Sequence, residues 1–206
     1  VTVSLDTLRP ERFRQLTRRD EYARVLEGIE SVGRVGFTGL KLDTVAIRGF
    51  NDDELVALIE FGKHYQAEVR FIEYMDVGTT NGWRMDDVVS AAEILSTIDA
   101  EMPLEPAEAN YAGEVARRWR YRDGGGEIGI IAPVSEPFCG HCNRIRLTAD
   151  GKVRTCLFSV TEHDLRSLLR GKAVVAWSAG AMAIAERVIL FHDHPPQGAG
   201  NAEVFD

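Results

Sequence analysis

Two hydrophobic periods alternate along the first half of the chain. Apolar stretches at residues 1–5, 40–47 and 68–75 have the composition of buried strands. Between them, apolar residues recur at helical spacing near 10–33, and Asn51 followed by three acidic residues predicts the capped start of a second helix. Strands that alternate with helices predict right-handed βαβ units and a parallel sheet, so the expected fold class is α/β.

The second half contains more turn residues. A helix is expected at about 86–98, opened by two acidic residues, and a Pro- and Glu-rich connection at 101–110. Strands are expected at 115–122 and 128–131, joined by a glycine-rich turn. A short helix capped by polar residues is expected within 161–170. This half therefore predicts a mixed α+β region.

The cysteines lie in one short segment, as a Cys-x-x-Cys pair at Cys139 and Cys142 and a third residue at Cys156. The Asp-Gly pair at 150–151, flanked by alternating apolar and polar residues, predicts a two-residue hairpin turn. That turn pairs Ile145 with Cys156 and returns the third thiol to within roughly 10 Å of Cys142 along the sheet. Small adjustments would let the three thiolates hold one inorganic centre.

Three thiolates are one ligand short of a closed zinc or cluster site. Such a centre keeps a metal position open for direct binding of a ligand. A structural zinc ion completed by His141 or His163 is the main alternative, and inert thiols are another. A disulfide framework is less consistent with the sequence, because the cysteine count is odd and nothing predicts secretion.

Two arginines lie between the thiols. Arg144 and Arg146 are two residues apart on the predicted strand, so they are expected on one face of it. Two guanidinium groups beside an open metal position suit an oxygen-rich anion, above all a phosphate. The alternative is a solvated strand face that carries two arginines.

Composition narrows the function classes. The 206 residues can form one good core or two small ones, and the net charge of −8 argues against a nucleic-acid-binding protein. No apolar run has the length of a membrane span and no signal pattern is present, so a cytoplasmic location without membrane contact is expected. Because residue 1 already reads as part of a strand, we expect that upstream sequence is missing.

These features resemble the C-terminal half of the radical S-adenosylmethionine GTP cyclases (GTP 3',8-cyclases, which are lyases) of molybdenum-cofactor biosynthesis. The resemblance runs from residue 1 to about 170. It is most specific at Val3–Asp6, at Arg70–Asp76 and in the segment from Pro137 to Phe158. In this family three hairpin cysteines hold a [4Fe-4S] cluster whose fourth iron takes the purine of GTP, which agrees with the open position inferred above.

The resemblance implies a role for particular positions. The implied cluster ligands are Cys139, Cys142 and Cys156. The implied contacts to GTP are Lys41, Arg70, Arg144, Ile145 and Arg146. The implied contacts to S-adenosylmethionine are Ser4 and Met75. The implied fold is an incomplete (β/α) barrel, of which residues 1–85 form the later part, followed by an α+β cluster-binding domain over 86–170.

The chain also departs from the family pattern. It lacks the family's Cys-x-x-x-Cys-x-x-Cys motif, which holds the radical-generating cluster, so the chain alone is expected to be inactive. The family's terminal double glycine is absent as well. Half a barrel would leave sheet edges unpaired at residues 1–5, so a homodimer or aggregation is expected. An iron–sulfur electron-transfer module is the alternative function.

The last segment, 171–206, has a different character. It resembles a fragment of a class I glutamine amidotransferase-like or peptidase E-like protein. A predicted strand at 172–177 leads to Ser178, between small residues, and then to a helix at 182–189, which is the layout of a nucleophile elbow. Without a visible base, Ser178 is not expected to be catalytic, and a serine hydrolase is the least favoured function.

Overall fold

The computed structural model describes residues 1–76, 82–111, 113–142, 144–157, 159, 161–169, 188–190 and 203–205. The chain forms two compact units, Val1–Cys142 and Asn143–Asp206. The predicted domain boundaries after residues 85 and 170 stay predictions. None of the helices in the described ranges is long and apolar enough to cross a membrane.

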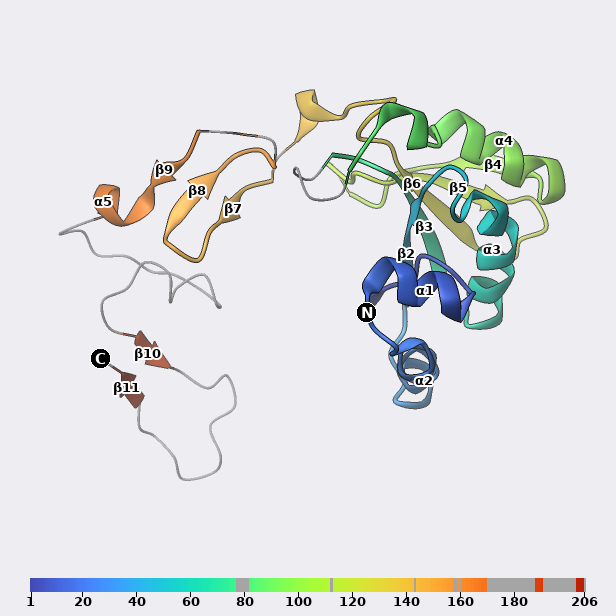
Figure 1. The fold of residues 1–206 in the computed structure, drawn as a ribbon, viewed down its shortest axis with the longest axis horizontal. Coiled ribbons are helices and arrows are strands. Elements are labelled where there is room, and N and C mark those ends of the chain that lie inside the picture. Colours follow the sequence, from blue (N-terminus) through green and yellow to red (C-terminus); the bar gives the residue numbers. More distant parts are fainter. Residues whose placement is uncertain are drawn as a thin grey trace. The chain divides into compact units, whose positions relative to one another are not determined.

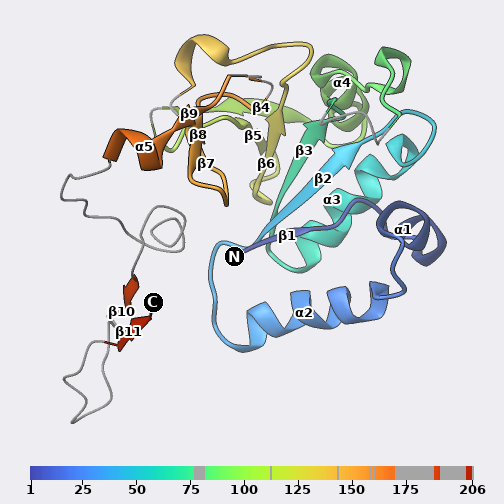
Figure 2. The same ribbon diagram turned by 60° about the vertical axis from the view of Figure 1, so that its left-hand side comes forward.

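The first unit contains a six-stranded sheet with the order β1-β2-β3-β6-β5-β4 (Figures 1 and 2). Its strands are β1 (Thr2–Ser4), β2 (Lys41–Ala46), β3 (Glu68–Glu73), β4 (Leu104–Ala107), β5 (Arg117–Tyr121) and β6 (Glu127–Ile131). Strands β1, β2, β3 and β6 are parallel, and β5 and β4 are antiparallel to their neighbours. The α/β class is confirmed at this level as a mixed sheet.

Strand β4 occupies part of the segment predicted as a connection. It contains Pro106, which has no N–H to donate to a ladder. Because β4 is the last strand of the sheet, a residue without an N–H can be accommodated there. The tertiary position therefore permits a strand that the composition argued against.

The helices are α1 (Pro10–Thr17), α2 (Tyr22–Arg34), α3 (Leu55–His64) and α4 (Ala91–Glu101), with short 3-10 turns η1 (Asp52–Glu54) and η2 (Met85–Asp87). The single helix predicted over 10–33 is wrong, because Arg18 adopts a left-handed conformation with φ of 58° that ends α1. The start predicted at residue 86 is also wrong. Ser90 forms the capping box with Glu93 and opens α4.

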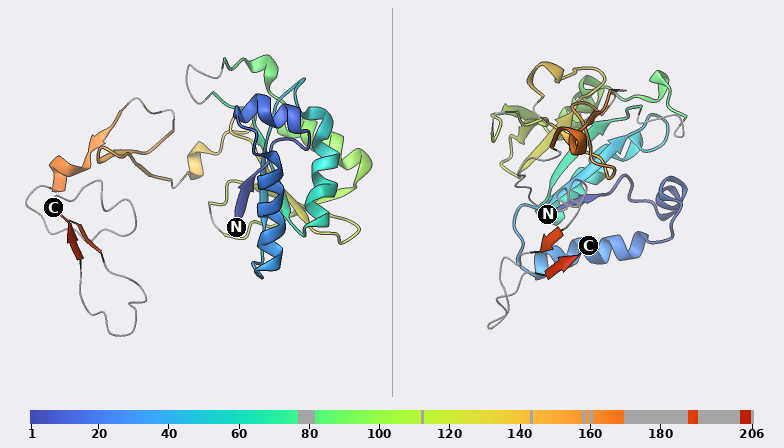
Figure 3. Two further views of the ribbon diagram at one scale, coloured as in Figure 1. Left: turned by 60° about the horizontal axis from the view of Figure 1, so that its bottom comes forward. Right: turned by 90° about the vertical axis from the view of Figure 1, so that its left-hand side faces the viewer.

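One face of this sheet forms the hydrophobic core. Helices α3 and α4 pack against each other, and α3 also contacts β3 (Figure 1). The fully buried core side chains include Leu42, Leu58, Phe71, Ile94, Ile98, Ile128 and Ile130. At the β1 edge, α2 runs beside the strand (Figure 3) and contributes the buried Ile29. Burying each large side chain contributes about 1.5–3 kcal/mol to the free energy of folding, so the burial of this face stabilises the first unit.

The second unit has much shorter elements. A three-stranded antiparallel sheet joins β7 (Arg146–Leu147), β8 (Lys152–Arg154) and β9 (His163–Asp164), followed by α5 (Leu165–Leu169). Asp164 accepts a hydrogen bond from the N–H of Ser167 at 3.1 Å, which confirms a capped helix start near 161–164. Strands β10 (Val188–Leu190) and β11 (Glu203–Phe205) pair antiparallel, so the helix predicted to reach residue 189 is wrong at its end.

The hairpin register differs by one residue from the prediction. Arg146 pairs with Arg154, and Gly151 donates its N–H to the Thr148 carbonyl at 3.0 Å. Gly151 has φ of 79°, so the turn has three residues and ends in a left-handed glycine. A one-residue slip moves side chains to the other face. The predicted pairing of Ile145 with Cys156 is therefore wrong.

Candidate functional site

The cysteine segment carries exposed thiols. Cys139 opens the 3-10 turn η3 (Cys139–His141), and the N–H of Cys142 bonds to the Cys139 carbonyl at 3.3 Å. Cys156 follows β8 in the second unit, and each cysteine is an exposed thiol rather than half of a disulfide. Across the described residues, no three His, Cys, Asp or Glu side chains are arranged to hold a metal ion. The donor chemistry itself, three accessible soft thiols, fits an iron–sulfur cluster.

The arginines of the hairpin are not equivalent. Arg144 and Ile145 precede β7, so the strand alternation predicted to align Arg144 with Arg146 does not extend to Arg144. Arg146 stands directly opposite Arg154, a like-charge pair that is unfavourable by itself. Glu162 neutralises the charge of Arg154, whose Nε donates a hydrogen bond to the Glu162 carboxylate at 2.7 Å. No ion pair to Arg146 occurs in the described part of the chain. The positive charge of Arg146 is therefore available to bind an anion.

Three of the predicted ligand-binding residues share the sheet face opposite the core. In the parallel register Ser4 pairs with Asp43, and Asp43 pairs with Arg70. Lys41 lies two residues before Asp43, on the same side of β2. The structure therefore brings Ser4, Lys41 and Arg70 onto one surface, which we call the charged face. It consists of the outward residues of β1, β2, β3, β5 and β6.

Arg70 is held firmly on the charged face. Its Nε donates to Glu68 at 2.7 Å, its Nη2 lies 3.7 Å from a Glu114 oxygen, and its side chain is 14% exposed. Gly129 of β6 lies beside it, and a Cβ at that position would come within 3.1 Å of the Arg70 Cγ and 3.2 Å of the Ala116 Cβ. The glycine leaves the space in which the Arg70 side chain crosses the sheet.

Carboxylates on this face were not among the predicted site residues. Burial, reinforced by the charge of Glu68, raises the pKa of Asp43, while Arg70 and Lys41 act in the opposite direction. The Asp43 Oδ1 and the Glu114 Oε1 are buried and have no hydrogen-bond partner in the described structure. The polar alternation of Lys41-Leu-Asp43 within a central strand was the available signal for Asp43. Glu114 gave none, because it precedes β5.

The carboxyl ends of the strands carry the remaining predicted contact. Met75 is half-buried two residues beyond the end of β3, and Ser4 is the exposed last residue of β1. Glu73, the last residue of β3, is fully buried on the core side of the sheet, where it accepts backbone hydrogen bonds.

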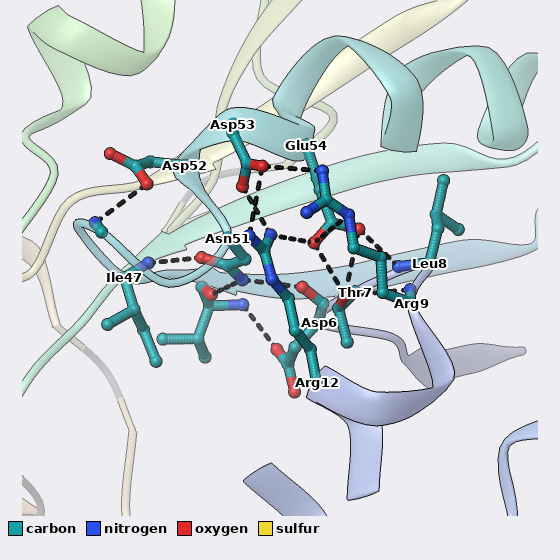
Figure 4. Close-up of polar contacts among 12 residues, drawn as sticks. Asp6, Thr7, Leu8, Arg9, Arg12, Ile47, Asn51, Asp52, Asp53 and Glu54 are labelled. Atoms are coloured by element: carbon teal, nitrogen blue, oxygen red, sulfur yellow. Dashed lines mark hydrogen bonds and ion pairs between the residues drawn. The ribbon is translucent and has the colours of Figure 1, made fainter. Parts of the chain in front are cut away.

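A buried network fixes the loops that follow β1 and β2 (Figure 4). Glu54, 3% exposed, accepts hydrogen bonds from the Thr7 hydroxyl at 2.8 Å and the Leu8 N–H at 2.8 Å, and pairs with Arg12. Asn51 accepts from the Ile47 N–H and donates to the carbonyls of Asp6 and Val45. Asn51 lies at the predicted cap position before η1, but its side chain makes no capping hydrogen bond and instead ties these two loops together.

Known proteins resemble most of this chain. The profile of the family described as Molybdenum Cofactor Synthesis C matches residues 67–186. A GTP 3',8-cyclase of Acidothermus cellulolyticus is 51% identical over 171 residues, which are 82% of this chain and 47% of that protein. GTP 3',8-cyclase 3 of Mycobacterium bovis is 50% identical over 84% of the chain and 46% of its own length. A GTP 3',8-cyclase of Xanthomonas axonopodis pv. citri is 45% identical over 85% of the chain and 53% of its own length.

The chain spans about half the length of these relatives. The aligned lengths confirm the resemblance predicted for the first 170 residues. The family profile also extends into the segment 171–206, as far as residue 186. Ser178 and its predicted elbow lie outside the described residues.

Proposed function

The chain belongs to the Molybdenum Cofactor Synthesis C family, and from that premise we propose that it is the part of a GTP 3',8-cyclase that binds GTP at a cysteine-ligated cluster. The complete protein would act in molybdopterin biosynthesis, with S-adenosylmethionine as its other small-molecule ligand. The observation that carries the proposal is the set of three exposed thiols in a segment that also contains Arg144 and Arg146. The identity to the cyclases over more than four fifths of the chain supports it.

We assign the ligands of one [4Fe-4S] cluster to Cys139, Cys142 and Cys156. When bound, a cluster with three thiolate ligands supplies one iron that is open to a further ligand. The residues around the cysteines would then orient that ligand. Arg144, Ile145 and Arg146 supply two guanidinium groups and an apolar side chain that is 69% exposed, which together suit a nucleotide.

The charged face carries two further proposed ligand contacts. Lys41 and Arg70 are its proposed GTP contacts. In the register of β2 and β3, Arg70 pairs with Asp43, two residues after Lys41. Arg70 is already oriented by Glu68 at 2.7 Å, so little side-chain entropy would be lost when a ligand binds. The proposed S-adenosylmethionine contacts are Ser4, at the end of β1, and Met75, beyond the end of β3. Both lie at the carboxyl ends of parallel strands, where ligands of α/β proteins bind.

Metal content tests the cluster assignment. After anaerobic reconstitution, the wild-type chain should contain about four irons and four sulfides, and Cys142→Ala should lose them. Thr155→Ala, an exposed neighbour of Cys156, is the matched control and should keep the full content. Zinc in place of iron, or equal iron in the wild type and Cys142→Ala, would contradict the proposal.

Nucleotide titration tests the substrate. Arg146→Ala should weaken GTP binding by about 1.5–3 kcal/mol, the usual loss for a charged hydrogen bond. Because the contact is an ion pair, the affinity of the wild type should also fall as salt is added. Arg154→Ala is the control, since Glu162 already compensates Arg154. A cluster that changes redox state without any affinity for GTP would favour the electron-transfer alternative.

A further inference from the structure

Glu73 joins three segments that are distant in the sequence. It is the last residue of β3 and is fully buried. Its Oε1 accepts hydrogen bonds from the N–H of Ala91, at 2.8 Å, and from the Ser135 hydroxyl. Its Oε2 accepts from the N–H groups of Val134 and Ser135, each at 2.8 Å. One carboxylate thus connects the end of β3, the start of α4 and the loop after β6.

The chemistry of this contact requires an anion with four acceptor sites. Each of these partners is a donor, and three of them are backbone N–H groups, of which that of Ala91 is buried and those of Val134 and Ser135 are partly buried. An ionised carboxylate accepts at both oxygens, whereas an amide of the same shape replaces one oxygen with an NH₂ donor. The contact is therefore specific for Glu at position 73.

The loop held by Glu73 leads directly into the cysteine segment. Cys139 lies four positions beyond Ser135, so their Cα atoms are at most roughly 14 Å apart. The intervening Glu136 pairs with Arg117 of β5, which adds an exposed second tether. Both Glu73 and the cysteine segment as far as Cys142 belong to the first unit.

We propose that Glu73 is a positioning residue that fixes the loop leading into the Cys139–Cys142 segment against the carboxyl ends of β3 and β6. An effect of Glu73 on the cluster rests on the proposed function, whereas its role in holding the loop does not. Met75 lies two residues beyond Glu73 on the same chain segment. The carboxylate therefore links the proposed S-adenosylmethionine contact to two of the proposed cluster ligands.

Hydrogen exchange on the metal-free full chain tests the positioning role. In Glu73→Gln, the amides of residues 134–142 should exchange about five- to hundredfold faster, as expected when buried charged hydrogen bonds are lost. Ser135→Ala removes only the hydroxyl donor at an exposed position, so it should give a smaller change at the same amides without loss of folding. Glu54→Gln is the matched control, because it removes a buried carboxylate that holds Thr7 and Leu8 instead.

Two exchange results would overturn the proposal. One is unchanged exchange at 134–142 in both variants while Glu54→Gln alters residues 7–9. The other is uniform acceleration throughout the first unit in Glu73→Gln with no local change in Ser135→Ala. Electron paramagnetic resonance of the reconstituted, reduced chain adds a second readout, in which Glu73→Gln should broaden or shift the cluster signal and Glu54→Gln should not. If the wild type takes up no iron, the proposed function fails, and the exchange experiment still decides the role of Glu73.

Discussion

The two units of this chain are stabilised in different ways. The first unit buries a continuous set of apolar side chains between a six-stranded sheet and its helices. The second unit has strands of two or three residues, and Ile145, Leu147 and Leu157 are exposed there. Among its described residues, the side-chain contacts include ion pairs in which Glu162 binds Lys152 and Arg154.

This difference indicates where external stabilisation matters. Small units that cannot bury a sufficient core commonly depend on a metal centre or a disulfide. The thiol of Cys156 is exposed and in no disulfide, so a cluster is the stabiliser that the proposed function would supply to the second unit. The first unit should fold without it.

The largest expected effect is loss of the first unit's core. Phe71→Ala removes a fully buried ring from β3 and should lower the free energy of unfolding by about 3–5 kcal/mol. Urea unfolding followed by helical circular dichroism reports it, because α1 to α4 all belong to the first unit. Val153→Ala in β8 should cost less than about 1 kcal/mol in the same assay. Equal losses of unfolding free energy in the two variants would contradict the difference between the two units.

A buried carboxylate of the first unit should matter next. Glu54→Gln removes charge from a site that accepts two hydrogen bonds and pairs with Arg12, and it should cost about 1–3 kcal/mol. Asp53→Asn is matched to it, because Asp53 pairs with the same arginine but is 47% exposed. Its cost should stay below about 1 kcal/mol. A larger loss for Asp53→Asn would show that burial does not decide the strength of these pairs.

In the second unit the corresponding change should be smaller and salt-dependent. Glu162→Gln should make the amides of β8 and β9 exchange only slightly faster, because its partners Lys152 and Arg154 are partly exposed. Hydrogen exchange at low and high salt measures this. Added salt should reduce the difference between the variant and the wild type. A salt-independent difference would indicate that packing, not charge, stabilises these strands.

The smallest expected effect concerns pH in the first unit. Hydrogen bonds from the Ser90 hydroxyl and N–H, with Arg48, lower the pKa of Glu93 from 4.5 to about 2. Because the folded pKa is depressed, the stabilisation is complete above the unfolded pKa and disappears as pH falls from about 4.5 towards 2. The free energy of unfolding of the wild type, measured with urea, should exceed that of Glu93→Gln at pH 6 by less than about 1 kcal/mol, and the two should converge on acidification. Divergence at low pH would contradict this.

Several features could be predicted from the sequence because their causes are local. Alternating strand and helix periods predicted β1, β2, β3 and the βαβ arrangement that the sheet confirms. The cysteine spacing and the flanking motifs indicated the family, which the comparisons bear out over the first 170 residues. These signals depend on residue type and spacing, which folding does not change.

Other features depended on the tertiary structure. The sequence could not show that Asn51 and Glu73 form these buried hydrogen bonds, since Asn51 donates to a carbonyl 45 residues away and Glu73 accepts from an N–H 62 residues away. Nor could it separate a two-residue turn from the three-residue turn at Gly151, because both use Asp-Gly. The row of Ser4, Asp43 and Arg70 arises from strand register, which is set when the opposite face of the sheet is buried. Local pattern determined the elements, and burial decided which polar side chains face one another.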